Sequence, residues 1–227
     1  MSLEERPWLM RRPAILMACG ATAAVAALFQ IRPEIDTTTA AAMWRLHAVP
    51  ALRAIGDAEP GALSVAVALF AGLVALAFVY LLLRRPLRTD RLRALIFILA
   101  TFAIGPGLIV NVILKDHWGR PRPIQTVVLG GSAAFVPALE TSRECEKNCS
   151  FVSGDVSAAI AFLTVAMLLP AVARRWASAG ILLLAVAIGF ARMVAGAHFL
   201  SDLLLAAGFT ALVMQICYRL IMPRRSG

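Results

Sequence analysis

The chain has 227 residues, of which 60% are hydrophobic and 15% are charged, and its mean hydropathy is +0.81. These values exclude an ordinary soluble domain and indicate an integral membrane protein. The formal charge of +9 does not indicate nucleic-acid binding, because the basic residues fall between apolar stretches and not along one polar face.

Apolar stretches of about 20 residues, the length that crosses a bilayer, recur along the chain. They predict an all-α protein, a six-span transmembrane helical bundle that forms one integral-membrane domain over residues 1–227. The first stretch is expected to be retained and not cleaved as a signal peptide, because it is long and no convincing cleavage site follows it. The expected spans are 13–31, 61–83, 94–114, 154–173, 177–196 and 199–221.

The distribution of basic residues predicts the orientation in the membrane. Six spans place both termini on one side, and more than half of the 22 basic residues lie in the short segments of that side. Because short basic segments stay in the cytoplasm, we expect cytoplasmic termini. Loops 32–60 and 115–153 and the turn near 197–201 then face outward.

Residues 37–56 carry Trp44, Arg45, His47 and Arg53 among alanines and leucines in the first of these loops. The pattern is typical of an interfacial helix that lies along the bilayer surface. It is equally typical of an ordinary loop with aromatic anchors, and the sequence does not choose between the two.

The first polar cluster, KDHWGRPRP, runs from Lys115 to Pro123 at the outer end of the third span. Its glycine and prolines end the helix and stiffen the path to Arg122. Lys115 is a compact cation, and the Arg122 guanidinium can bind two oxygens of one phosphate. The cluster predicts either a phosphate site or a basic patch against lipid headgroups.

Two of the four cysteines, Cys145 and Cys149, lie four residues apart in the outer loop. A disulfide is expected there if the compartment is oxidising. Zinc is the alternative, but no second Cys pair or suitably spaced His accompanies them. Cys19 and Cys217 lie in apolar spans and are expected to be small buried hydrophobic residues.

The second cluster, SFVSGDVSAA, begins the fourth span. Ser153 is a good N-cap, and Gly154 allows close approach of the backbone, so free amides and the positive end of the helix dipole would face an anion. Capping alone would also explain both residues, and Asp155 would suit the first helical turn in either case.

The third cluster, ARMVAGAHFLSDLLLA, joins the fifth and sixth spans. His198 and Asp202 are four residues apart, so on a helix they would share a face, and the carboxylate would accept from one imidazole nitrogen. The other nitrogen would be free as a nucleophile. A purely structural His–Asp pair is the alternative, but it does not explain Arg192 at the end of the fifth span.

The three clusters together resemble the three-part signature of the type-2 phosphatidic acid phosphatase superfamily. The apolar spans make the chain more similar to its membrane-bound lipid phosphatases than to its soluble acid phosphatases and haloperoxidases. The residue sequences of the motifs are most similar to those of the lipid A phosphatases of Gram-negative bacteria. The matching residues are Lys115 with Arg122 and Pro123, Ser153 with Gly154, and Arg192 with His198 and Asp202.

The resemblance implies a metal-independent phosphatase in the bacterial inner membrane, with its site facing the periplasm. His198 would attack phosphorus and form a phosphohistidine that water then hydrolyses, and Asp202 would orient it. No cofactor is expected, and the expected partners are a lipid phosphate substrate and membrane lipids, without nucleic acid. The groups expected to hold the phosphate oxygens are Lys115, Arg122, Ser153, Gly154 and Arg192.

One position departs from the family pattern. Asp155 and Val152 stand where the second motif usually has His and Pro, and that His protonates the leaving oxygen. Because three cations are expected nearby, an Asp would seldom carry a proton there at neutral pH. Burial against lipid would reverse this effect and let Asp155 carry the proton. His117 is an alternative acid. A third explanation is a leaving group that needs little help from an acid, such as an anomeric sugar oxygen or a second phosphate.

Location and resemblance leave several substrates open. Lipid A is favoured, where the anomeric 1-position would fit the missing His, and the 4′-position is also open. The alternatives are undecaprenyl diphosphate, phosphatidylglycerol phosphate, phosphatidate and phosphate transfer to another lipid. An anion-binding transporter would need charges at mid-span and helix breaks, and the only candidate break, at 105–107, has no charge beside it. A catalytically silent relative is the last alternative.

Overall fold

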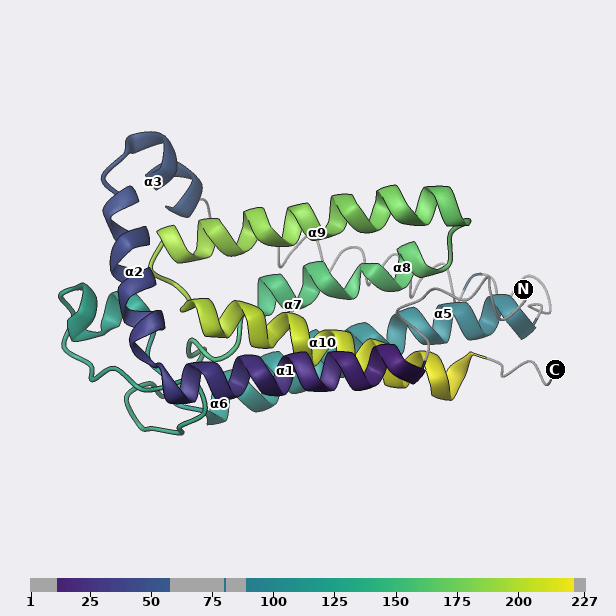
Figure 1. The fold of residues 1–227 in the computed structure, drawn as a ribbon, viewed down its shortest axis with the longest axis horizontal. Coiled ribbons are helices and arrows are strands. Elements are labelled where there is room, and N and C mark those ends of the chain that lie inside the picture. The colour runs from purple at the N-terminus through teal and green to yellow at the C-terminus, as the bar shows by residue number, and fades with distance from the viewer. Residues whose placement is uncertain (1–11, 58–79, 81–88, 223–227) are drawn as a thin grey trace.

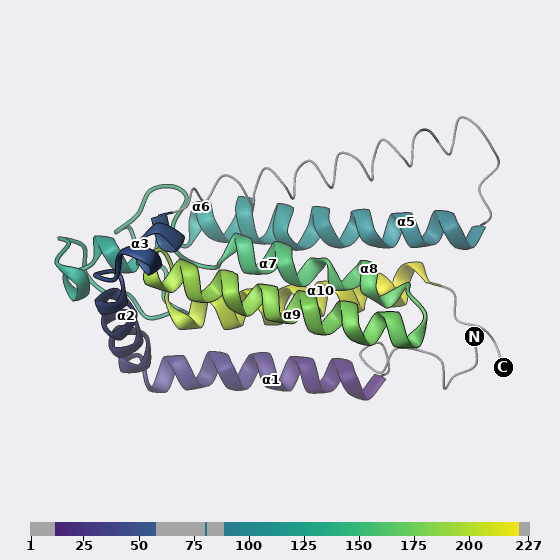
Figure 2. The same ribbon diagram turned by 90° about the horizontal axis from the view of Figure 1, so that it is seen from above.

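A computed structural model describes residues 12–57, 80 and 89–222 of the chain. In that part the long helices run side by side, and short helices and loops cover one end of them (Figures 1 and 2). The described residues form no β-strand, and their only bridge pairs Thr126 with Ala133. The predicted all-α membrane helical bundle is confirmed.

Three helical stretches of the described residues are long and apolar enough to cross a membrane, namely Asp90–His117, α9 (Ala171–Val194) and α10 (Leu200–Ile221). A fourth passes only as a pair, because α1 (Arg12–Ile31) and α2 (Glu34–Leu46) are bent by 85°. The six-span count is therefore not confirmed. Most of the predicted span 61–83 lies outside the described residues.

The predicted span 154–173 is broken into shorter pieces. Helix α7 (Gly154–Ala161) and helix α8 (Leu163–Met167) are separated at Phe162. Helix α9 begins directly after Pro170, six residues before the predicted start of its span. Proline favours the first turn of a helix because its missing amide has no intrahelical acceptor there, which explains the early start.

The third span contains a π-helix. Helix α5 (Thr89–Phe102) continues through η3 (Ala103–Leu114) into the short α6 (Lys115–His117). Pro106 lies inside η3, and the wider π-helical turn accommodates a residue that cannot donate a backbone hydrogen bond. The candidate break at 105–107 is thus a continuous helix, and it delivers Lys115 to the end of the bundle.

The segment 37–56, for which an interfacial helix and an ordinary loop were both open, contains parts of two helices, α2 and α3 (Pro50–Asp57). Helix α2 lies across the end of the bundle, opposite the end where α1 begins and α10 finishes (Figure 1). The chain turns at His47, whose ring stacks on Trp44 with centroids 4.5 Å apart.

Helix α10 is the centre of the bundle, because it packs against α1, α5 and α7. Its buried residues include Leu205, Ala206 and Met214, and the facing helices contribute Phe29 and Phe97 to the same core. A central helix is fixed on several sides, so the residues at its first turn hold well-defined positions.

Candidate active site

The three predicted clusters converge at the end of the bundle that α2 covers. Helix α6 ends there, α7 begins there, and the turn between α9 and α10 lies there (Figure 1). Among the described residues, the buried charged side chains and the buried His198 all belong to this end: Asp36, Arg120, Arg192, His198 and Asp202. Within the spans that the structure describes, no buried charge lies at mid-span, where a transporter would need one.

His198 is buried and lies just before α10. Its Nδ1 is 2.8 Å from the backbone carbonyl oxygen of Ser150. Since a carbonyl only accepts, Nδ1 carries the proton and Nε2 keeps a free lone pair. Burial, the main cause, lowers the pKa of His198 and favours this neutral form.

The expected hydrogen bond from His198 to Asp202 does not form. The distance between His198 Nδ1 and Asp202 Oδ2 is 3.8 Å, and Ser150 takes the place of the carboxylate. The prediction assumed that both residues lie on one helix, but α10 begins at Leu200 and its N-cap, Phe199, is extended with φ −78° and ψ 162°. The spacing of four therefore spans a turn and not a helical face.

Asp202 instead fixes the turn and the segment that holds His198. Its Oδ2 accepts from the Phe199 amide at 2.9 Å and from the Ser150 hydroxyl at 2.6 Å. The hydroxyl and carbonyl of Ser150 thus connect Asp202 to the imidazole in two bonds. Asp202 orients His198 through Ser150 and the backbone, not by direct contact.

A fully buried arginine completes the network beneath Asp202. Arg120 Nη1 lies 2.6 Å from Asp202 Oδ1, and Nη2 lies 2.8 Å from Asp36 Oδ2 on α2. Its Nε donates to the Val136 carbonyl at 2.8 Å, and its guanidinium lies 4.3 Å from the centroid of the Phe199 ring. One cation thus joins two carboxylates in the interior, where each charge needs a partner.

Sequence reasoning missed Asp36, Arg120 and Ser150. The first two are 84 residues apart, so no local spacing relates them. The available signal was the requirement that an Asp near the end of an apolar span has a partner. That requirement was applied to Asp202, but the nearest His was chosen in place of Arg120, the first arginine of the first cluster.

The predicted phosphate-binding cations form a cluster near His198. Lys115, Arg122 and Arg192 are close enough to interact electrostatically with one another. Burial and then Arg192 lower the pKa of Arg122, but a guanidinium stays charged in proteins. Three mutually repelling cations at a helix terminus indicate a site for an anion.

The start of α7 lies against Lys115. Ser153 caps the helix, with its hydroxyl 3.4 Å from the Val156 amide. A side chain at Gly154 would place its Cβ 2.8 Å from Asn111 Oδ1 and 3.2 Å from Lys115 Nζ. Only glycine therefore lets the helix terminus and the ammonium group approach each other this closely.

Asp155 and His117 occupy different surroundings. Asp155 Oδ2 lies 3.2 Å from Arg192 Nε, an ion pair without hydrogen-bond geometry. His117 is exposed, and its Nδ1 lies 3.1 Å from the carbonyl oxygens of Val112 and Ile113 in its own helix. The ring of His117 is thus turned back along the helix, which does not favour it as the alternative acid, whereas Asp155 is among the cations.

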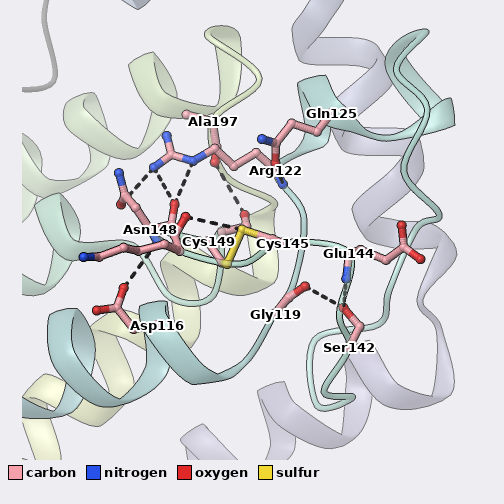
Figure 3. The surroundings of a disulfide bond; sticks show 12 residues. Asp116, Gly119, Arg122, Gln125, Ser142, Glu144, Cys145, Asn148, Cys149 and Ala197 are labelled. Carbon is pink, nitrogen blue, oxygen red and sulfur yellow. Dashed lines mark hydrogen bonds between the residues drawn. A yellow bond between two sulfur atoms is a disulfide. The ribbon is translucent and has the colours of Figure 1, made fainter.

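The predicted disulfide is present. Cys145 and Cys149 are bonded to each other, with Cα atoms 5.8 Å apart (Figure 3), so these sulfurs are not zinc ligands. Cys217 is buried as expected, but Cys19 is exposed on α1, because the side of α1 that carries it does not pack against the described helices.

Comparison with known proteins gives a consistent result. The model of the PAP2 superfamily matches residues 93–226, which is more than half of the chain. A lipid A 4′-phosphatase of Rhizobium leguminosarum is 40% identical over 116 residues, covering 51% of this chain and 50% of that protein. A lipid A 4′-phosphatase of Francisella tularensis subsp. novicida is 37% identical over 137 residues, covering 59% and 60%.

A third relative, a lipid A 4′-phosphatase of Rhizobium etli, is 40% identical over 116 residues, covering 51% of this chain and 45% of that protein. The chain therefore spans about half the length of the curated relatives it matches. No solved structure matches.

Proposed function

This chain belongs to the PAP2 superfamily, and we propose that it is a lipid phosphatase that removes the 4′-phosphate of lipid A. The observation that carries the proposal is the geometry of His198. Its Nδ1 is bonded to a carbonyl, and Lys115 and Arg122, which lie near Arg192, are close enough to act on it electrostatically. The family alone would leave many lipid phosphates open. The relatives' names favour lipid A and the 4′-position over the anomeric 1-position.

The first chemical step is attack by His198 on phosphorus. Nε2 supplies the electron pair, and the bond from phosphorus to the sugar oxygen breaks, which gives a phosphohistidine and the free 4′-hydroxyl. The imidazole becomes positively charged as it attacks. Asp202 stabilises this charge from 3.8 Å, and the Ser150 carbonyl keeps the ring aligned.

The three cations stabilise the charge on the phosphoryl oxygens in the transition state. Lys115 lies near Gly154 at the start of α7, Arg192 is paired with Asp155 in the first turn, and Arg122 lies in the loop after α6. The Ser153 amide, which was expected to be free, donates to the Asp202 carbonyl. Helix α7, which begins at Gly154, adds the positive end of its dipole. Such donors are fixed before substrate arrives, so they need no reorganisation during the reaction.

The second step is hydrolysis of the phosphohistidine. Water attacks phosphorus, the bond to Nε2 breaks, and inorganic phosphate leaves with His198 neutral again. Asp155 is the proposed proton carrier for both steps, because it is a carboxylate in the first turn of α7, beside Arg192 of the phosphate-binding cluster. A phosphate that enters as the monoanion brings the proton that the 4′-oxygen needs, and Asp155 relays it.

The proposed orientation places the site at the periplasmic face of the inner membrane. Helix α1 begins and α10 finishes at the end opposite the site (Figure 1), and the basic segments there favour the cytoplasm. The disulfide near the site supports an oxidising compartment on the same side. Lipid A in the outer leaflet would then present its phosphate to the cluster directly.

The test is phosphate release by the purified full chain from lipid A, with mass spectrometry of the product. We expect loss of one phosphate from the 4′-position, and loss of release in His198→Ala by at least 10³-fold, since the nucleophile is absent. Undecaprenyl diphosphate, phosphatidylglycerol phosphate and phosphatidate serve as competing substrates. Release that is unchanged in His198→Ala would contradict the mechanism, and preference for another lipid would contradict the substrate.

A further inference from the structure

The Cys145–Cys149 disulfide closes a small ring that touches the phosphate-binding side of the site (Figure 3). Within it, Asn148 has a positive φ of 50°, a conformation that Asn tolerates better than most residues. This turn directs both the backbone carbonyl and the side-chain amide of Asn148 at one neighbour, Arg122. The ring therefore holds two acceptors in place.

The contacts between Asn148 and Arg122 are numerous for an exposed residue. Arg122 Nη2 donates to the Asn148 carbonyl and to Asn148 Oδ1, both at 3.1 Å, and Arg122 Nε is 3.3 Å from the same carbonyl. These three contacts fix the plane of the Arg122 guanidinium, which would otherwise rotate freely. A planar cation must be oriented before it can bind two oxygens of one phosphate.

The ring is itself anchored to the helix that carries the first cluster. The Asn148 amide donates to Asp116 Oδ1 at 3.3 Å, and the Cys149 amide donates to the Lys115 carbonyl at 3.0 Å. Cys149 is fully buried, so one end of the ring is fixed by packing. The disulfide transmits that fixed position to Asn148.

We propose that Asn148 is a positioning residue for Arg122, and that the Cys145–Cys149 disulfide is required to keep it in place. The backbone carbonyl and the side-chain Oδ1 of Asn148 hold the Arg122 guanidinium toward the site. Phosphate therefore meets a cation that is already oriented. Opening the ring lets both acceptors move, so the Arg122 guanidinium is no longer held in one orientation before phosphate binds. The inference rests on the proposed function for its activity readout, but not for its binding readout.

The test measures two quantities in the full chain: the KM for release from lipid A and the dissociation constant of inorganic phosphate from calorimetry. Cys145→Ser opens the ring and leaves the buried Cys149 in place. Asn148→Gly tolerates the positive φ and removes the side chain with its Oδ1, while the backbone carbonyl stays. We expect Cys145→Ser to raise both constants roughly tenfold and Asn148→Gly about threefold, as expected for lost hydrogen bonds to a charged group.

Combination with Arg122→Ala separates positioning from general stability. In an Arg122→Ala background, neither substitution should change phosphate affinity by more than about twofold, because the group they act through is absent. Lys147→Gly, which alters the neighbouring exposed residue of the same ring, is the matched control and should bind phosphate like the parent. A reducing agent should reproduce the Cys145→Ser effect in the parent and in a Cys19→Ser control.

Three results would overturn the proposal: unchanged phosphate affinity in Cys145→Ser, an equal loss with and without Arg122, or an equal loss in Lys147→Gly. If Cys145→Ser does not fold, Asn148→Gly carries the same test. A parent chain that binds inorganic phosphate but releases none from any lipid would contradict the proposed function and leave the positioning test intact. A parent that binds no phosphate would contradict both.

Discussion

Two arginines of the first cluster, Arg120 and Arg122, are only two residues apart but have opposite surroundings. Arg120 is fully buried, and two carboxylates and a carbonyl accept its hydrogen bonds. Arg122 is only partly buried, and its described partner is one exposed residue, Asn148. The difference separates a cation that supports the fold from a cation that remains available for a ligand.

The same division extends through the whole site. Asp36, Ser150 and Asp202 belong with Arg120, because they are buried and bonded to one another. Lys115, Arg192 and Asp155 belong with Arg122, because no side-chain hydrogen bond that the structure describes joins them to the Arg120 network, although Arg192 is itself buried. Removing a residue of the first group should cost stability, and removing one of the second should cost catalysis.

The largest effect is expected from Arg120→Met. It leaves the carboxylates of Asp36 and Asp202 buried without a cation, which should lower the free energy of unfolding by about 3–5 kcal/mol. Chemical denaturation in detergent micelles measures this change. Arg122→Met is the matched control and should change stability by no more than about 0.5 kcal/mol. Equal stability in the two variants would remove the distinction between them.

A smaller effect, on catalysis and phosphate binding and not on stability, is expected from Asp155→Asn. Loss of the proton carrier should lower kcat on lipid A about 100-fold, whereas Arg192, freed from its ion pair, should bind inorganic phosphate more tightly. Steady-state kinetics with phosphate as inhibitor measures both quantities. Asp155→His should retain activity, because imidazole can also carry the proton. An Asp155→Asn variant as fast as the parent would place the acid elsewhere.

The smallest effect is expected from pH. Burial lowers the pKa of His198 below its usual 6.5, so Nε2 keeps its lone pair at neutral pH. The value of kcat/KM should stay level as pH falls to 6.5 and then drop about tenfold per pH unit below the lowered pKa. The free energy of unfolding should fall between pH 6.5 and the lowered pKa, because in that window the unfolded chain binds the proton and the folded chain does not. Loss of activity already above pH 7 would contradict this assignment.

The sequence predicted the elements whose signal is local. The length of the apolar stretches located the long helices that the structure describes. The cap of α7 and the disulfide were predictable because the residues that form each of them lie within a few positions of one another. The interior network was not predictable in this way, because Asp36 reaches Ser201 across 165 residues. The direct His198–Asp202 hydrogen bond was predicted wrongly for a related reason: α10 begins only after Phe199, so His198 is not on the helix that the spacing of four assumed.

Asp36 lies on α2, outside residues 93–226 that match the family. The segment that matches the family therefore contains the buried Arg120 but lacks one of the two carboxylates that pair with it. An engineered chimera that joins 93–226 to the first half of another membrane protein would inherit Arg120 with one of its two carboxylates missing. Such an exchange should succeed only where the donor supplies an acidic side chain across the end of the bundle.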